Sequence, residues 1–315
     1  MPGSLSGFKS MLIQIKPVEL SPVDPDIKAQ FRLDTLAGRD LLQEQIQKDI
    51  DEWCQLQYDS GPRSHLGASI IGHECERYIW FSFRWMYYEK YSGRMQRLFQ
   101  RGHLEETRVT EWLRGIGFTV HQFDEQGQQY RVIFSDKHGG GSSDGVGEMP
   151  TRYGKFEPLL LEFKTQKDKK FNILQGSGVQ KEKPMHFIQA SIYGRRHGLQ
   201  YCLYIAVNKE DDDLDVEVIE LDWDLADAEM NKADKIITSE FPPRRISDNP
   251  SFWKCKYCPA LGICHLGAPV ERNCRSCYYA VPVENGEWTC NYWKNTIPKD
   301  FIPKGCDQWH QIATR

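Results

Sequence analysis

The sequence lacks any apolar run of the length that crosses a bilayer as a helix, about 20 consecutive residues. It also lacks a signal-peptide pattern, because the short apolar patch at residues 11–15 has no hydrophobic core region and no small-residue cleavage site. A large excess of charge of one sign is missing too, since the chain has 40 Lys and Arg and 44 Asp and Glu. We therefore expect a cytoplasmic protein without a membrane contact, and any nucleic-acid path must be a local basic surface.

Internal repeats and long low-complexity segments are likewise absent, and 315 residues that are 40% hydrophobic allow one large core and a small appendage. Hydrophobic periodicity predicts helices at 40–56, 69–88, 95–114, 184–197 and 223–239. Strand patterns cover 118–123, 130–134, 143–147, 159–165, 201–208 and 214–221. This order predicts an α/β fold with a mixed central sheet flanked by helices, after an extended arm at 1–33 and an N-terminal helical part.

An acid-x-Lys tripeptide at the end of a buried strand is the first candidate for chemistry. Glu162 and Lys164 follow the apolar run Leu159–Leu160–Leu161, and alternation along a strand places both on one face with Phe163 on the other. Asp144 follows the run Gly139–Ser143, which we expect to be a flexible approach to a short strand. Carboxylates on neighbouring strands suit Mg²⁺ or Mn²⁺. The alternative is an exposed strand face with an ion pair.

Side chains on two predicted helices add to this set. His103 and Glu106 lie one turn apart on the helix before the sheet, and an imidazole there would complete a metal site. Gln189 and Tyr193 lie one turn apart on the helix after it and would contact the scissile phosphate or the nucleophile. A metal held by such carboxylates lowers the pKa of a bound water, and Lys164 would orient that water or stabilise negative charge.

The ordered series His103, Asp144, Glu162-x-Lys164, Gln189-x3-Tyr193 resembles the RecB-like branch of the PD-(D/E)xK nuclease superfamily over residues 65–265. The resemblance implies a restriction-endonuclease-like fold. It also implies metal ligands at His103, Asp144, Glu162 and the carbonyl of Phe163, a catalytic Lys164, and assisting roles for Gln189 and Tyr193. The chain departs from the family pattern at Ser143, where a proline usually precedes the aspartate.

Ten cysteines in a chain without a secretory pattern favour metal sites over disulfides. Cys75 stands alone, whereas Cys255, Cys258 and Cys264 form a C-x2-C-x5-C run. This split pattern resembles the iron–sulfur members of the same branch, the CRISPR-adaptation and AddB-type nucleases, and implies a 4Fe–4S cluster on these thiols. Spacing alone leaves tetrahedral Zn²⁺ open.

The last fifty residues carry a second cysteine set. Cys274, Cys277, Cys290 and Cys306 form C-x2-C-x12-C-x15-C, which predicts a zinc-ribbon-like module at 266–315, with His310 as an alternative to Cys306. Its aromatic residues, with Arg275 and Lys294, would contact single-stranded DNA, or equally a protein partner.

These patterns predict a metal-dependent DNA nuclease built from the arm at 1–33, a nuclease domain at 34–265 and the C-terminal module. The family resemblance favours an exonuclease that acts at DNA ends in recombination, repair or phage genome processing. Two alternatives stay open: an endonuclease of the same superfamily, and a DNA-end-binding adaptor with a vestigial site.

Overall fold

The computed structural model describes residues 18–124 and 127–313, so the apolar patch at 11–15 and the first half of the predicted arm lie outside it. The chain divides into two compact units. The smaller unit comprises Met1–Ser60 with Lys90–Arg101, and the larger comprises Gly61–Glu89 with Gly102–Arg315. The division into an arm, a nuclease domain and a C-terminal module stays a prediction.

Helices make up most of the described part of the smaller unit. α1 (Pro25–Lys28) is a short turn within the described part of the predicted arm, and α2 (Leu36–Tyr58) confirms the helix predicted at 40–56. Thr35 caps α2, because its hydroxyl accepts a hydrogen bond from the Gly38 N–H at 3.1 Å. The unit also takes in the first residues of α5 (Gly93–Gly115), whose Arg97 forms an ion pair with Asp51.

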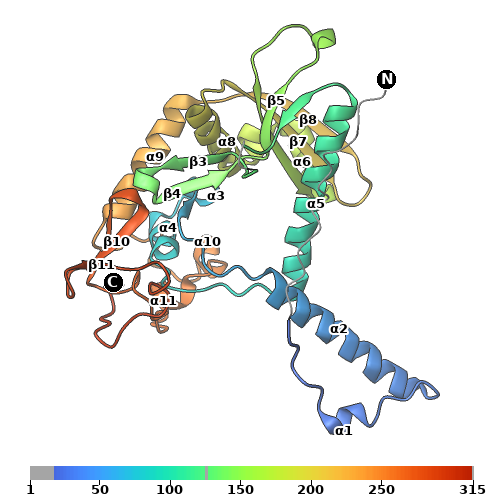
Figure 1. Cartoon of the computed structure of the whole chain (residues 1–315), viewed down its shortest axis with the longest axis vertical. Helices are drawn as coiled ribbons and strands as arrows, with labels where there is room; N and C mark the ends of the chain where they lie inside the picture. The colour runs from blue at the N-terminus through green and yellow to red at the C-terminus, as the bar shows by residue number, and fades with distance from the viewer. Residues whose placement is uncertain (1–17, 125–126, 314–315) are drawn as a thin grey trace. The chain divides into compact units, whose positions relative to one another are not determined.

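A five-stranded mixed sheet lies at the centre of the larger unit, with strand order β2-β5-β6-β7-β8 (Figure 1). β6 and β7 run parallel, and every other neighbouring pair is antiparallel. The predicted mixed central sheet flanked by helices is therefore confirmed. Its strands are β2 (Thr119–His121), β5 (Gly145–Glu148), β6 (Leu159–Gln166), β7 (Tyr201–Asn208) and β8 (Leu214–Glu220).

Helices cover both faces of this sheet. On one face, Val109 and Leu113 of α5 pack with Leu161 and Phe163 of β6. On the other face, Leu160 of β6 packs in a larger core with residues of α8 (Pro184–His197) and α9 (Trp223–Thr238). β6 is thus buried on both faces, as its continuous apolar run predicts. The connection from β6 to β7 also contains α6 (Asp168–Ser177) and α7 (Val179–Glu182).

Two predicted segments differ from the structure. The glycine-rich segment, expected to be a flexible approach, forms β4 (Gly139–Ser142), which lies between β1 (Leu66–Gly67) and β3 (Arg131–Phe134) in a second sheet. The helix predicted at 69–88 is two helices, α3 (Ala68–Ile71) and α4 (Glu76–Phe83). The helix breaks because Cys75 is extended and its N–H bonds to the ring of His73 at 3.0 Å.

The remaining elements are short. The C-terminal part contains α10 (Trp253–Lys256), α11 (Leu261–His265), β9 (Ala280–Val283), β10 (Glu287–Cys290) and β11 (Asn295–Thr296). Single 3-10 turns occur at Ser135–Lys137, Thr151–Tyr153 and Glu284–Gly286. No helix among the described residues is both long and apolar enough to span a membrane.

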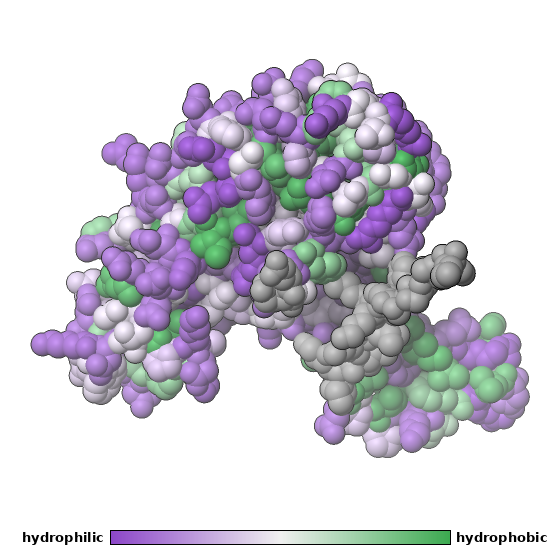
Figure 2. All heavy atoms as spheres, turned by 45° about the horizontal axis from the view of Figure 1, so that its top comes forward, coloured by the Kyte–Doolittle hydropathy of each residue, from purple (hydrophilic) through white to green (hydrophobic). Residues whose placement is uncertain are grey.

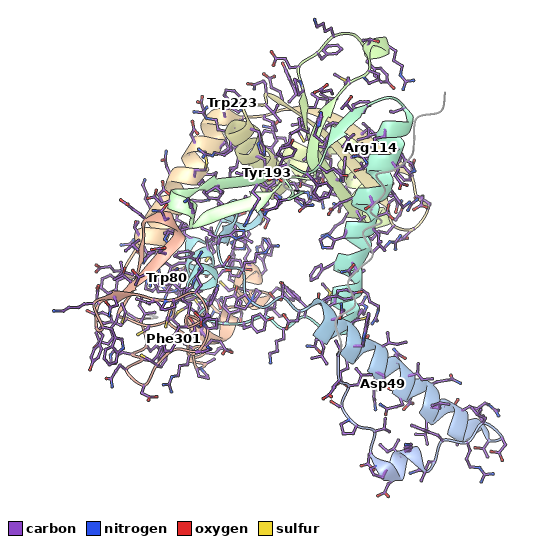
Figure 3. All side chains as sticks on the ribbon, viewed as in Figure 1. Asp49, Trp80, Arg114, Tyr193, Trp223 and Phe301 are labelled. Carbon is purple, nitrogen blue, oxygen red and sulfur yellow. The ribbon has the colours of Figure 1, made fainter. Side chains whose placement is uncertain are left out.

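The C-terminal segment packs into the main core and α4. Trp288 of β10 is 1% exposed and its ring lies 5.3 Å from that of Phe83 on α4. The guanidinium of Arg275 is buried against both rings and donates to the carbonyl of Phe83 at 3.1 Å. Arg275 is therefore a packing residue, and its predicted contact with DNA is wrong. Figure 3 shows Trp80 of α4 and Phe301 of this segment at the same end of the unit.

On the face of this unit that Figure 2 shows, hydrophobic side chains do not gather into one broad surface. Figure 2 shows hydrophilic side chains over most of its visible face, with hydrophobic ones in small separate groups. Most apolar residues of the central strands β6 and β7 lie inside, whereas Val216 and Val218 of the edge strand β8 are exposed.

We expect Trp288→Ala to lower the free energy of unfolding by about 3–5 kcal/mol, because it removes a fully buried indole from a shared core. Trp293→Ala is the matched control, since that indole is 57% exposed in the same segment and should change stability by less than about 0.5 kcal/mol. Urea denaturation followed by circular dichroism measures both. A Trp288→Ala protein as stable as Trp293→Ala would show that the segment does not share the core.

Candidate active site

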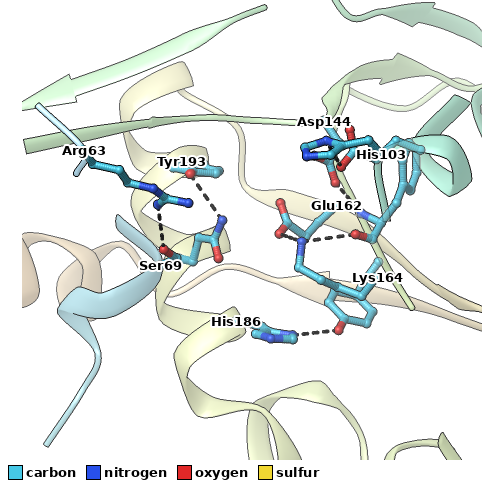
Figure 4. A network of polar contacts seen from close by, with 12 residues as sticks. Arg63, Ser69, His103, Asp144, Glu162, Lys164, His186 and Tyr193 are labelled. Atoms are coloured by element: carbon cyan, nitrogen blue, oxygen red, sulfur yellow. Dashed lines mark hydrogen bonds and ion pairs between the residues drawn. The ribbon is translucent and has the colours of Figure 1, made fainter. Parts of the chain in front are cut away.

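Strand β6 presents Glu162 and Lys164 on the face that α8 covers, while Phe163 points into the opposite core. Lys164 Nζ forms an ion pair with Glu162 Oε1 and donates to the carbonyl oxygen of Phe163 at 3.1 Å (Figure 4). Strand alternation therefore places this pair as the sequence predicted.

Asp144 lies directly before β5, the strand beside β6. Its Oδ2 accepts the backbone N–H of Phe163 at 2.6 Å, a donor that would otherwise be left over at the end of the β5–β6 ladder. The carboxylate is thereby fixed beside Glu162, and the short charge-assisted bond also stabilises the sheet locally.

Glu162 is 1% exposed, and neither of its oxygens has a hydrogen bond of good geometry within the described part of the chain. Oε1 has only the contact with the Lys164 ammonium. Burial raises the pKa of Glu162 to about 7; Lys164 opposes this shift and Asp144 adds to it. A buried carboxyl with free lone pairs is costly unless a cation or a proton satisfies it.

Glu106 on α5 belongs to the same electrostatic group. Burial, together with the charges of Asp144 and Glu162, raises its pKa to about 7, and Lys164 opposes this shift. The sequence places Glu106 one turn from His103, but it was given no role there. The helical spacing places Glu106 on the face of His103, but the sequence does not show that this face lies near the carboxyls of the sheet.

His103 lies on the same turn of α5, and Figure 4 draws it in one network with Asp144 and Glu162. Its side chain is 67% exposed, and Nδ1 lies 3.7 Å from Glu106 Oε1. The imidazole is thus at the solvent side of the group, and Glu106 is its nearest charged partner among the ion pairs of the described residues.

Gln189 and Tyr193 on α8 face the same space. Gln189 Nε2 donates to the Tyr193 hydroxyl at 3.2 Å, and burial, followed by the charge of Glu162, raises the pKa of Tyr193. Gly141 of β4 allows this placement, because a Cβ there would lie 2.1 Å from the Tyr193 hydroxyl oxygen. Here the glycine run serves close packing instead of flexibility.

A further pair was missed by the sequence analysis. His186 Nδ1 lies 2.8 Å from the Tyr204 hydroxyl, and burial, then Lys164, lowers the pKa of His186 to about 3. His186 shares the α8 face of Gln189, and Tyr204 is paired with Glu162 in the β6–β7 register. Helical spacing places His186 on the face of Gln189. The place of Tyr204 beside Glu162 follows only from the parallel pairing of β6 with β7, which the sequence does not contain.

The arrangement places the carboxyls of Glu106, Asp144 and Glu162 around the single ammonium of Lys164. Burial alone would lower the pKa of Lys164, but Glu162 and Asp144 outweigh it and raise the pKa. The acidic excess can be balanced by bound protons or by a hard cation, which takes oxygen ligands. Among the described residues, however, no three His, Cys, Asp or Glu side chains are grouped so that they hold a metal ion as they stand.

The split cysteines come together. Cys75, at the start of α4, lines one cavity with Cys255, Cys258 and Cys264. Burial raises the pKa of Cys255, and the thiols of Cys75 and Cys264 raise it further. The four thiols thus line one cavity, but as they stand these described residues are not grouped tightly enough to hold a metal ion, and the site stays a prediction.

The C-terminal cysteines also converge. Burial raises the pKa of Cys274 to about 11, with added contributions from Cys306, Cys277 and Cys290. His310 contacts this set through its backbone, since its N–H donates to Cys277 Sγ at 3.4 Å. Its ring instead packs beside Tyr278 and Tyr279.

No protein-family model matches the chain, and no curated protein matches it. Among solved structures, the chain is similar to SSO0001 at 14% identity and a TM-score of 0.39, over 71% of this chain and 97% of that one. It is similar to the alkaline exonuclease LHK-Exo from Laribacter hongkongensis at 17% identity and a TM-score of 0.35, over 56% and 87%. The complex of LHK-Exo with dAMP gives 16% identity and 0.35, over 55% and 86%. Similarities this low assign neither a fold nor a function to the chain.

Proposed function

We propose that this chain is a divalent-metal-dependent DNA nuclease that hydrolyses phosphodiester bonds, and that it acts as an exonuclease. The observation that supports this most is the buried carboxyl of Glu162, whose only partner among the described side chains is the Lys164 ammonium, and which lies beside Asp144 and Glu106. The donor set suits Mg²⁺ or Mn²⁺, with the carbonyl of Phe163 and the imidazole of His103 as further ligands. The exonuclease preference comes from the family resemblance.

When bound, such an ion lowers the pKa of a water and polarises the phosphoryl oxygen. The side chains of the chain then have separate tasks. Asp144 and Glu162 would supply carboxylate oxygens as metal ligands. The Phe163 N–H of β6 holds the Asp144 carboxyl in place, and Lys164 of the same strand contacts that of Glu162. Lys164 offers an ammonium for the negative charge that develops on the phosphate. Gln189 and Tyr193 supply an amide and a hydroxyl on the facing helix for contacts with the same phosphate.

End-labelled linear and internally labelled circular single-stranded DNA, incubated with Mn²⁺, test this proposal. An exonuclease degrades the linear DNA and leaves the circle intact, whereas an endonuclease cleaves both. Asp144→Asn is the matched variant, because its amide oxygen can still accept the Phe163 N–H while the negative charge is lost. If the wild type cleaves no DNA with any divalent metal yet binds DNA ends, the adaptor alternative is correct.

We further propose that Cys75, Cys255, Cys258 and Cys264 hold a 4Fe–4S cluster. Four thiols in one cavity suit either this cluster or Zn²⁺. Burial and the neighbouring thiols raise the pKa of Cys255 and of Cys258, and a bound cation would favour their thiolates. The cluster would link residues far apart in the chain and so restrict the unfolded state.

We expect Cys255→Ser to lose both the visible absorbance of thiolate-ligated iron and its solubility. Metal analysis of the same preparation should find iron in the wild type and little in the variant. Cys202→Ser is the control, since that buried cysteine lies in the sheet core. Zinc without iron in the wild type would refute the cluster and leave the thiol site as a zinc site.

The C-terminal set of Cys274, Cys277, Cys290 and Cys306 is proposed to bind Zn²⁺. Beside it, the rings of Tyr278, Tyr279, Tyr292 and Trp293 follow one another at centroid distances of 5.0–5.4 Å. Tyr278 and Trp293 are 60% and 57% exposed, so this aromatic row is available to a partner. We assign the row to partner contact, through DNA bases or an apolar protein surface.

A further inference from the structure

A polar row leads away from the carboxyls along β6 and α8. On β6, the side chains of Glu162, Lys164 and Gln166 share one face, since they alternate with Phe163 and Thr165. Successive members lie about 7 Å apart by the rise of a strand. On α8, His186 and Gln189 face this row, and Lys183 immediately precedes the helix. The row thus begins acidic at Glu162 and ends basic at Lys183.

Lys183 is the unexplained cation in this row. It is partly buried, and Nζ donates to Gln166 Oε1 at 3.0 Å, an uncharged acceptor. No carboxylate within the described ranges lies within 4.0 Å of this ammonium as an ion-pair partner. Burial lowers the pKa of Lys183, and the nearby Lys170 of α6 lowers it further, while Glu182 opposes the shift. An ammonium held in this way favours an anionic ligand.

The surroundings fix Lys183 in place without neutralising it. Gln166 is 8% exposed and is aligned with Asn208 of β7, whose amide donates to Asp168 Oδ1 at 3.2 Å. Asp168 is thereby engaged with Asn208 and also with Asn172. The amide oxygen of Gln166 accepts one of the three N–H donors of the Lys183 ammonium and so orients the side chain.

We propose that Lys183, oriented by Gln166 and assisted by Lys170, binds a backbone phosphate of a DNA strand next to the phosphate that lies at Glu162 and Lys164. This inference rests on the proposed function, because the strand is placed by the carboxyl site. Lys164 and Gln166 lie two residues apart on β6, about 7 Å by the rise of a β-strand. A lysine acts there as a point charge on the phosphate and carries no sequence information.

The test measures binding apart from cleavage. Affinity for a fluorescent single-stranded oligonucleotide is determined by anisotropy with Ca²⁺ at several salt concentrations. We expect Lys183→Gln to weaken binding about tenfold and to reduce the slope of log affinity against log salt by about 0.7. Lys181→Gln is the matched control, because Lys181 is exposed on the short helix α7, two residues before Lys183, and it should change affinity less than twofold. Lys183→Arg should restore most of the affinity, and melting temperatures establish that all variants fold.

Oligonucleotides with one uncharged methylphosphonate locate the contact. In the wild type, neutralising one internal phosphate should weaken binding about tenfold, whereas in Lys183→Gln the same replacement should have no further effect. If the penalty persists unchanged in Lys183→Gln, or if Lys183→Gln binds like Lys181→Gln, the subsite does not exist.

The experiments distinguish a failure of the Lys183 phosphate subsite from a failure of the nuclease proposal. DNA that is bound with this Lys183 dependence but is never cleaved would refute the nuclease and leave the subsite. DNA that is cleaved in an Asp144-dependent manner, without any effect of Lys183→Gln on binding, would refute the subsite and leave the nuclease.

Discussion

The rate of DNA hydrolysis is expected to fall by about 10³-fold when Lys164 is replaced by methionine. Methionine keeps the length and the apolar part of the side chain but removes the ammonium that contacts Glu162. That ammonium lowers the pKa of both Glu162 and Glu106. Without it, the pKa of these carboxyls rises further above about 7, so both are protonated at neutral pH and bind a metal poorly.

The pH dependence of the rate separates two roles of Lys164. If the ammonium acts only through the carboxyl pKa, raising the pH from 7 to 9 should recover most of the lost rate. If it also stabilises charge on the phosphate, a large deficit remains at pH 9. We expect the deficit to remain, because Lys164 Nζ lies in the site itself, between Glu162 and the Phe163 carbonyl.

Lys167→Met is the matched control, since Lys167 follows directly after β6 and its side chain is exposed. It should retain the wild-type rate within about twofold, the range of a surface substitution. Melting curves identify any unfolded protein, because removing one partner of a buried pair costs about 3–5 kcal/mol. A folded Lys164→Met protein that cleaves DNA at the wild-type rate would exclude Lys164 from the chemistry.

Regular segments of the fold could be predicted because their patterns are local. The ranges 184–197 and 201–208 coincide with α8 and β7, where apolar residues recur at helical spacing or in a continuous buried run. The strand of Gly139–Ser142 could not, since glycines carry no side chains whose alternation marks a strand. It forms because Gly139 and Gly140 pair with Leu66 and Gly67 on one side and with β3 on the other.

In the candidate site, too, features that depend on neighbouring residues could be predicted, and features that depend on distant residues could not. Strand alternation alone predicts that Glu162 and Lys164 share a face, because it depends on neighbouring residues. The role of Glu106 depends on α5 packing over the β6 end of the sheet, and the burial of Arg275 depends on contacts with residues almost 200 positions away, such as Phe83. No spacing within a single segment contains those contacts. Exposed cations and buried ones therefore look alike in the sequence of the C-terminal segment.

A strong pH dependence of metal binding follows from the carboxyl group of Glu106 and that of Glu162. Both have an ordinary pKa near 4.5 that burial raises to about 7. Below pH 7 each carries a proton that a metal must displace, and above pH 7 each is already ionised. The affinity for Mn²⁺ should therefore increase with pH by about tenfold per unit for each proton released, up to pH 7, and then level off.

Isothermal titration calorimetry with Mn²⁺ at pH 6, 7 and 8, without DNA, measures this dependence. Two buffers that differ in ionisation enthalpy give the number of protons released on binding. Glu106→Gln should remove about one proton from that number and flatten the slope between pH 6 and 7 accordingly. Glu111→Gln, which replaces an exposed carboxyl on the same helix α5, should leave both unchanged.

An affinity for Mn²⁺ that is equal at pH 6 and pH 8 would contradict the protonation of these carboxyls, and the Mn²⁺ would then bind elsewhere in the chain. A steep rise that disappears in Glu106→Gln would instead identify Glu106, a residue given no role by the sequence, as part of the metal site.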